Sequence, residues 1–146
     1  MKSTAKLIAT LLVFIFSFGC TSNDTSSPSG CEECSYSVAS NETAGTIPAS
    51  LNGVHNLTFA YAQPGSPFTD GTTATFTFDN NTVTIEISGS DCITLKNPIQ
   101  TSASETTFKD TCRNNLSFAF SVTQSGSLNE VNVMSTSNNW FGQFTN

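Results

Sequence analysis

The cysteines are the residues whose type and spacing point most directly to chemistry. Four of the five follow residue 30, namely Cys31, Cys34, Cys92 and Cys112. A Cys-x-x-Cys pair can be a redox centre, but a low thiol pKa needs a helix N-terminus, and the intervening Glu32 and Glu33 would raise it. A zinc ribbon needs a second close pair, whereas Cys92 and Cys112 stand twenty positions apart. In an exported chain, the sequence therefore favours two disulfides.

The first twenty residues carry the features of an export signal. Lys2 and Lys6 supply positive charge, and an apolar run from Leu7 to Phe18 follows. This run is shorter than the ~20 residues that span a bilayer as a helix. A cleaved signal peptide typically has this order of a short basic segment, an apolar stretch and small residues at the cleavage site.

The end of this segment, Ser17-Phe18-Gly19-Cys20, resembles the lipobox of bacterial lipoproteins. Ser17 stands where the usual pattern has Leu, as in the looser lipoboxes associated with Bacteroidota. The resemblance implies that residues 1–19 are removed, that Cys20 carries a lipid, and that the protein is anchored to the outer membrane or cell surface. The alternative is an ordinary secretory peptide cut after Gly19, which would give a secreted protein.

Four cysteines allow three disulfide pairings. We favour Cys31–Cys34 and Cys92–Cys112. The second pair follows from an expected hairpin between a strand at Ile93–Leu95 and a strand at Thr106–Thr111, because its open end would bring Cys92 and Cys112 together.

Few residues could support catalysis or metal binding. His55 is the single histidine, and Asp70, Glu86 or Asp91 could partner it, but no nucleophile or phosphate-loop motif occurs. We therefore predict no catalytic residues and no enzyme activity. Asp70, Asp79 and Asp91 lie in turn-rich segments and could bind calcium weakly as a cofactor, although turns use the same residue types.

Three aromatic residues are speculative ligand-binding candidates. Tyr61, Trp140 and Phe141 could stack on a sugar ring, although a core role for at least two of them is the stronger expectation. Possible partners are thus a protein or a glycan, besides the membrane reached through the lipid.

Charge argues against nucleic-acid binding. The chain has five Lys and Arg against eleven Asp and Glu, with a formal net charge of −6. If residues 1–19 are removed, only Lys96, Lys109 and Arg113 remain basic. No basic cluster of the kind that binds phosphate backbones is present.

Period-two patterns dominate after residue 52. They include Leu57, Phe59 and Tyr61, then Ala74, Phe76 and Phe78, then Val83, Ile85 and Ile87, and each set is expected to form the one buried face of a strand. Turns at Asn80-Asn81 and Ser125-Gly126 would pair Phe78 with Val83 and Phe120 with Val131. A closing strand is expected at Trp140–Phe144, where Gly142 allows a bulge or a close neighbour. The chain should be all-β, a single antiparallel sandwich or small up-and-down barrel of seven to eight strands.

The domain organisation follows from these patterns. Residues 20–50 are rich in Ser and Thr and are expected to form a flexible tether with the Cys pair, although Tyr36, Val38 and Ile47 could dock a segment of it. Residues 51–146 form the predicted β domain.

The sequence predicts a cell-envelope lipoprotein that presents a small β domain for binding or a structural role. The alternatives are an inhibitor or accessory subunit of an exported protein or polysaccharide system, and a small extracytoplasmic hydrolase. Clustered exposed aromatic residues would favour a glycan, and a concave cleft with two close carboxylates would favour hydrolysis.

Overall fold

The computed structural model describes residues 30–146. The predicted signal peptide, the lipidation site Cys20 and the first part of the predicted tether lie outside the described residues.

Strands form where apolar and polar residues alternate, and turns rich in Gly, Asn and Ser separate them. Among the described residues, the only helical element is the 3-10 turn η1 (Ala49–Leu51). The strands are β1 (Glu32–Ser35), β2 (Gly53–Ala62), β3 (Thr73–Asp79), β4 (Thr82–Ile87), β5 (Ile93–Lys96), β6 (Ile99–Ser102), β7 (Glu105–Asp110), β8 (Leu116–Val122), β9 (Leu128–Ser135) and β10 (Trp140–Thr145).

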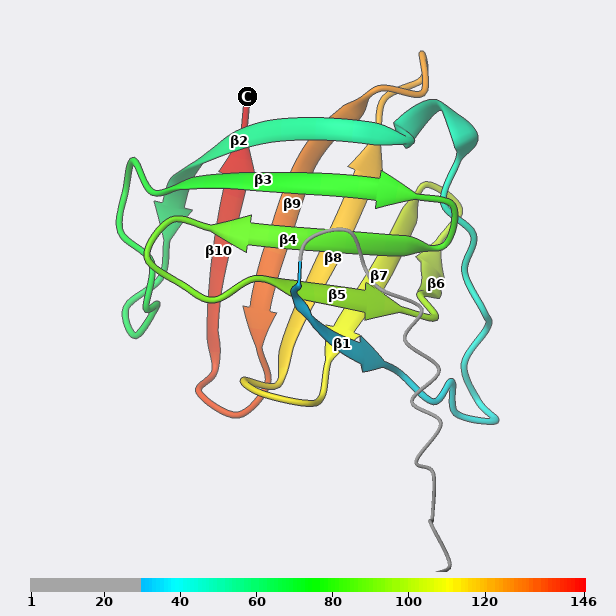
Figure 1. The fold of residues 1–146 in the computed structure, drawn as a ribbon, viewed down its shortest axis with the longest axis horizontal. Coiled ribbons are helices and arrows are strands. Elements are labelled where there is room, and N and C mark those ends of the chain that lie inside the picture. The colour runs from blue at the N-terminus through cyan, green and yellow to red at the C-terminus, as the bar shows by residue number, and fades with distance from the viewer. Residues whose placement is uncertain (1–29) are drawn as a thin grey trace, which may run out of the picture.

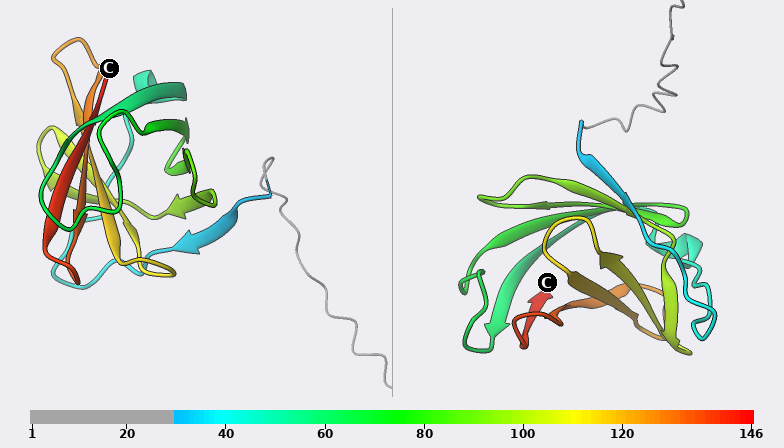
Figure 2. Two further views of the ribbon diagram at one scale, coloured as in Figure 1. Left: turned by 90° about the vertical axis from the view of Figure 1, so that its left-hand side faces the viewer. Right: turned by 90° about the horizontal axis from the view of Figure 1, so that it is seen from below.

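All ten strands belong to one curled sheet in the order β1-β5-β4-β3-β2-β10-β9-β8-β7-β6. Every neighbouring pair is antiparallel except β1 and β5, which run parallel. The half-sheet β2–β5 crosses in front of the half-sheet β6–β10, and the two face each other as a half-barrel (Figures 1 and 2). The all-β prediction is confirmed, but the predicted seven to eight strands were too few because β1 and β6 were not recognised.

The two predicted hairpins are confirmed, register included. Phe78 pairs with Val83 across a turn in which Asn80 has a φ of +53°, a conformation that Asn tolerates. Phe120 pairs with Val131 across the β8–β9 turn. The predicted closing strand is β10.

The core fills the space between the two half-sheets and is dominated by phenylalanine. Phe76 on β3 contacts Phe120 on β8 and Phe144 on β10, with ring centroids 5.8 and 5.5 Å apart. Phe78 also meets Phe120, at 4.8 Å. Burying each such side chain contributes on the order of 1.5–3 kcal/mol, so these edge-to-face contacts hold the halves together.

The predicted hairpin between Ile93–Leu95 and Thr106–Thr111 is wrong. Strand β5 pairs with β4 and β1, whereas β7 pairs with β6 and β8. Between β5 and β6 the chain turns at Asn97, whose φ is +60°, and Pro98, which has no N–H to continue a ladder. This corner moves the chain from one half-sheet to the other and leaves β5 and β6 unpaired with each other.

The predicted disulfide pairing is also wrong. The bonds join Cys31 to Cys92 and Cys34 to Cys112. Because β1 is extended, residues three positions apart lie about 10 Å from each other, farther than the Cα separation that a disulfide accepts. Each cysteine of the Cys-x-x-Cys pair therefore reaches a different partner.

Residues 36–48, here called the seam strap, cross the gap between β5 and β6. Ala44 bridges Ile99, the Gly45 N–H donates to the Pro98 carbonyl at 2.8 Å, and Ile47 is buried. A Cβ on Gly45 would lie 2.8 Å from the Ile99 carbonyl carbon, so the approach is very close. From residue 31 onward, the range expected as tether thus carries β1 and the docked strap.

Candidate ligand-binding cleft

The two half-sheets enclose a cleft of about 560 Å³ at one end of the half-barrel. Four loops surround it, β2–β3, β4–β5, β7–β8 and β9–β10. Its floor consists of inward-facing apolar side chains, among them Ile85, Ile93, Leu116, Phe118 and Trp140. Its polar lining includes Asp91, Arg113, Asn114 and Asn138. Mouths of β-barrels are common places for small ligands.

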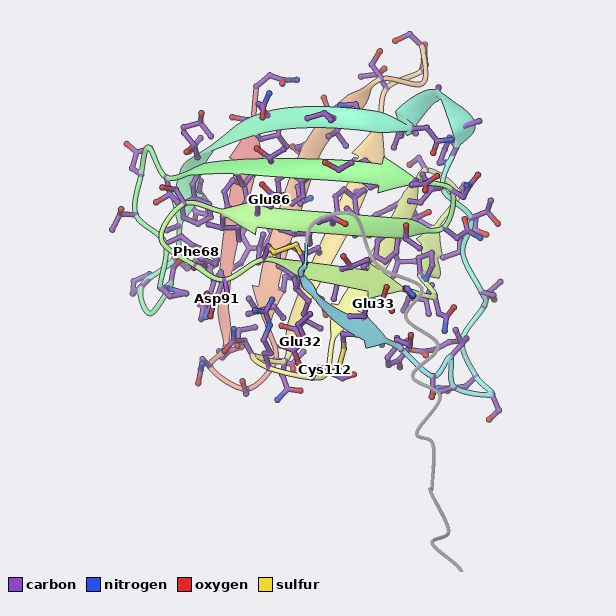
Figure 3. All side chains as sticks on the ribbon, viewed as in Figure 1. Glu32, Glu33, Phe68, Glu86, Asp91 and Cys112 are labelled. Atoms are coloured by element: carbon purple, nitrogen blue, oxygen red, sulfur yellow. A yellow bond between two sulfur atoms is a disulfide. The ribbon has the colours of Figure 1, made fainter. Side chains whose placement is uncertain are left out.

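Both disulfides lie next to residues that line the cleft. Cys92 stands between Asp91 and Ile93, and Cys112 stands between Asp110 and Arg113 on the opposite wall. Figure 3 labels Glu32 on β1, with Asp91 and Cys112 in the loops beside it. Strand β1 therefore links the two walls of the cleft covalently.

Arg113 is a cation with an unused hydrogen-bond donor. Its Nη1 donates to the Asp91 carbonyl at 3.2 Å, whereas its buried Nε has no hydrogen-bond partner within residues 30–146. The nearest carboxylate oxygen recorded for Nε, Oε2 of the exposed Glu32, lies 3.7 Å away. A buried donor left unpaired costs about 1–3 kcal/mol, so an acceptor bound at this position would relieve that cost.

Asp110 shapes the loop that presents Arg113. Its carboxylate is buried and accepts three backbone N–H groups, from Cys112 at 3.1 Å, Arg113 at 3.0 Å and Asn114 at 3.3 Å. Such side-chain caps fix a turn in place of a helix or strand. The sequence did not identify Asp110 or Arg113, and the only signal was that Arg113 is one of three basic residues after Cys20.

The residues considered for catalysis are separated. His55 donates a hydrogen bond from Nε2 to the Leu51 carbonyl, 2.9 Å away, and packs edge-on against Phe78. It does not line the cleft, whereas Asp91 does, and Glu86 points outward on β4 opposite Thr75. The second carboxylate of the cleft, Asp110, accepts hydrogen bonds from three backbone N–H groups.

The three calcium candidates lie apart. Asp79 is the last residue of β3, where its Oδ1 accepts a hydrogen bond from the Asn80 side-chain amide at 2.8 Å, and Asp70 and Asp91 are in loops at the other ends of β3 and β4. In the part of the chain that the structure describes, the one group with metal-ligand geometry is Cys34, Asp110 and Cys112. Its two sulfur atoms are joined in a disulfide, so they offer no thiolate to a metal.

The three aromatic candidates divide between two faces. Trp140 is 3% exposed and lines the cleft floor, where it contacts Phe68 with ring centroids 5.9 Å apart. Tyr61 and Phe141 instead lie together on the outside of the sheet, 6.1 Å apart. The prediction that Tyr61 shares the inner face of Leu57 and Phe59 is wrong, because a β-bulge shifts the register after Phe59.

An ion pair fastens the seam strap to β7. Glu42 accepts hydrogen bonds from Lys109, Ala39 and Tyr36, and these donors lower the pKa of its carboxyl from 4.5 to about 2, with Lys109 the largest cause. The Glu42 carboxylate in turn raises the pKa of Lys109. The ammonium also lies over the Tyr36 ring, 4.6 Å from its centroid.

Within residues 30–146, no helix has the length and apolar character needed to cross a membrane. No family model matches the chain, and no curated protein or solved structure shows significant similarity to it.

Proposed function

We propose that this protein is a cell-envelope lipoprotein whose β domain binds a small amphipathic molecule in the cleft. The observation that carries this proposal is the Arg113 side chain, which lines the cleft together with apolar side chains and whose buried Nε has no hydrogen-bond partner within residues 30–146. A ligand with an apolar body and one acceptor group, such as a carboxylate or sulfonate, complements both features.

Location is proposed from the N-terminal sequence. The lipobox-like segment ending at Cys20 supports an anchored, extracytoplasmic protein, and two disulfides are common in oxidising compartments. Because β1 begins at Glu32, only a short stretch of chain would separate a lipid on Cys20 from the cleft.

Local charge limits the acceptor to a single small group. Among residues 30–146, Arg113 is the only basic residue lining the cleft, and Asp91, Asp110 and the neighbouring Glu32 are acidic. A polyanion would meet net repulsion there, whereas a monoanion can place its one charged group on the guanidinium.

The test uses two probes of similar shape and different charge. Anilinonaphthalene sulfonate (ANS) has a sulfonate, and N-phenylnaphthylamine (NPN) is neutral. Trp140, the single tryptophan, lines the cleft and reports binding by fluorescence quenching. Arg113→Met should weaken ANS binding about tenfold, equivalent to ~1.4 kcal/mol, and leave NPN binding within about twofold.

Two further variants sharpen the result. Glu32→Gln removes the carboxylate that competes for Arg113 and should strengthen ANS binding. Lys96→Met is the matched control. Like Arg113, Lys96 is a basic residue that faces a carboxylate of β1, in its case Glu33, but Lys96 does not line the cleft. The proposal fails if neither probe quenches Trp140, or if Arg113→Met weakens both probes equally.

A further inference from the structure

A second feature lies on the outside of the half-barrel, away from the cleft floor. Where β2 pairs with β10, Tyr61 lies opposite Gln143 but Phe59 lies opposite Phe144, so Ala60 is an extra residue on β2. In a regular strand, Tyr61 would lie on the same inward face as Leu57 and Phe59, because residues two positions apart share a face. The bulge aims it outward instead, and bulges are often found where a side chain is redirected for function.

The redirected tyrosine belongs to an exposed group of apolar side chains. Tyr61 is 51% exposed, and its ring lies 6.1 Å from that of Phe141 on β10, at an angle of 51°. Met134 on β9 pairs directly with Phe141 and is 38% exposed. Tyr61 and Met134 are two of the three large apolar side chains that the described residues expose, so this cluster is unusual for the molecule.

Ordered polar groups border the aromatic pair. Gln143 donates from Nε2 to Glu130 at 2.7 Å and to Asn132 at 3.1 Å, and Asn132 donates to Glu130 at 3.1 Å. These bonds fix the three side chains beside Tyr61 before any ligand arrives, which lowers the entropic cost of binding. They also leave the carbonyl oxygen of Gln143 and the second N–H of Asn132 available.

Strand β10, which carries Phe141 and Gln143, packs closely against the core. Gly142 faces inward, and a Cβ at this position would lie 2.3 Å from Cζ of Phe59. Strand β10 can therefore lie directly against the core ring, and Phe141 and Gln143 project outward from a fixed backbone.

We propose that this outer patch, Tyr61, Phe141 and Met134 with Gln143, Asn132 and Glu130, binds an uncharged carbohydrate chain. The C–H face of a sugar ring packs on aromatic faces, and its hydroxyls both donate to carboxylate and carbonyl oxygens and accept from amide N–H groups. Glu130 is the one charged group of the patch, in a chain with a net charge of −6, so an anionic polymer is disfavoured. Six side chains are too few for a stable protein interface, which buries about 800 Å² on each partner.

The test is native affinity electrophoresis in gels that contain hydroxyethyl cellulose, xyloglucan, xylan or mannan, with polygalacturonate as the anionic comparison. We expect retardation in at least one neutral gel and none in polygalacturonate. Tyr61→Ala and Phe141→Ala should each weaken that binding about tenfold, whereas Tyr61→Phe should retain it.

Val54→Ala is the matched control, because Val54 is an exposed apolar residue of the same strand β2, outside the patch. It should leave retardation unchanged, and thermal melts should show that all variants fold. Arg113→Met should also leave retardation unchanged, which separates this patch from the cleft. The inference is overturned if no neutral polysaccharide retards the protein, or if the tyrosine and phenylalanine variants are retarded as strongly as the wild type.

Discussion

The two half-sheets meet at two junctions, and the junctions are built differently. At β2 and β10 they join through backbone hydrogen bonds over a phenylalanine core, with Phe59 and Phe144 facing each other at 4.9 Å. At the seam, β5 and β6 do not pair, and the gap is closed by β1, the seam strap and two disulfides. The first junction is thus a hydrogen-bonded strand ladder, and the second is held by cross-links and a docked segment.

The lack of strand pairing at the seam explains why the disulfides lie there. A seam without strand pairing lacks the backbone hydrogen-bond ladder that resists opening elsewhere in the sheet. The bond between Cys34 and Cys112 crosses from β1, which belongs with β5, to the end of β7. Covalent and ionic contacts thus replace the hydrogen-bonded ladder at the seam.

The largest effect is expected at the paired junction. Phe144→Ala removes a fully buried ring that contacts Phe59 and Phe76, and should lower the free energy of unfolding by about 3–5 kcal/mol. Phe141→Ala, on the same strand but facing outward, should cost about 1 kcal/mol or less. Urea melts of both variants measure this, and similar losses would mean that β10 is not oriented as described.

A smaller effect is expected from removing the disulfide that crosses the seam. The chain between Cys34 and Cys112 spans 78 positions, and Cys34→Ser/Cys112→Ser should cost about 2–4 kcal/mol. Cys31→Ser/Cys92→Ser should cost a similar amount, since its span of 61 positions is comparable. Without Cys31–Cys92, strand β1 is still held to β5 by backbone hydrogen bonds, whereas Cys34–Cys112 is the covalent bond that joins β1 to the opposite wall. Only the first double variant should therefore weaken ANS binding in the cleft. Equal binding by both variants would show that β1 does not hold the cleft in shape.

The smallest effect is expected at the ion pair of the seam strap, and it depends on pH. The folded pKa of Glu42, about 2, is below its unfolded value of 4.5, so the contribution of this carboxylate is present above about pH 4.5 and is lost as pH falls toward 2. Glu42→Gln should therefore have a lower melting temperature than the wild type at pH 7. The difference between the two melting temperatures should shrink as the pH falls from 4.5 to 2. A difference that stays constant over this range would contradict the role assigned to Glu42.

Local patterns explain which parts of the fold the sequence predicts. The β3–β4 and β8–β9 hairpins follow from alternation and turn residues within about ten positions, and both registers are as expected. The pairing of β5 with β1 and the disulfide partners depend on contacts 60 or more residues apart, which periodicity does not encode.

The candidate sites were predicted less well for a similar reason. Tyr61 and Phe141 were recognised by type, but the bulge at Ala60 decides that they face outward together, and one extra residue in a strand leaves no pattern in the chain. Arg113 becomes a cleft residue only because Asp110 folds the β7–β8 loop and because β1 brings Glu32 beside it.

The claim that a ligand enters the cleft is tested most directly by amide chemical-shift mapping of the protein from residue 20 onward, titrated with decanoate. We predict that the amides of Asp91, Arg113 and Asn138 and the indole N–H of Trp140 shift together and saturate, while those of Asn80 and Asn81 at the opposite end stay unchanged. Arg113→Met should abolish the saturable shifts. Shifts that are absent, or that spread evenly over the sheet in both proteins, would contradict the account.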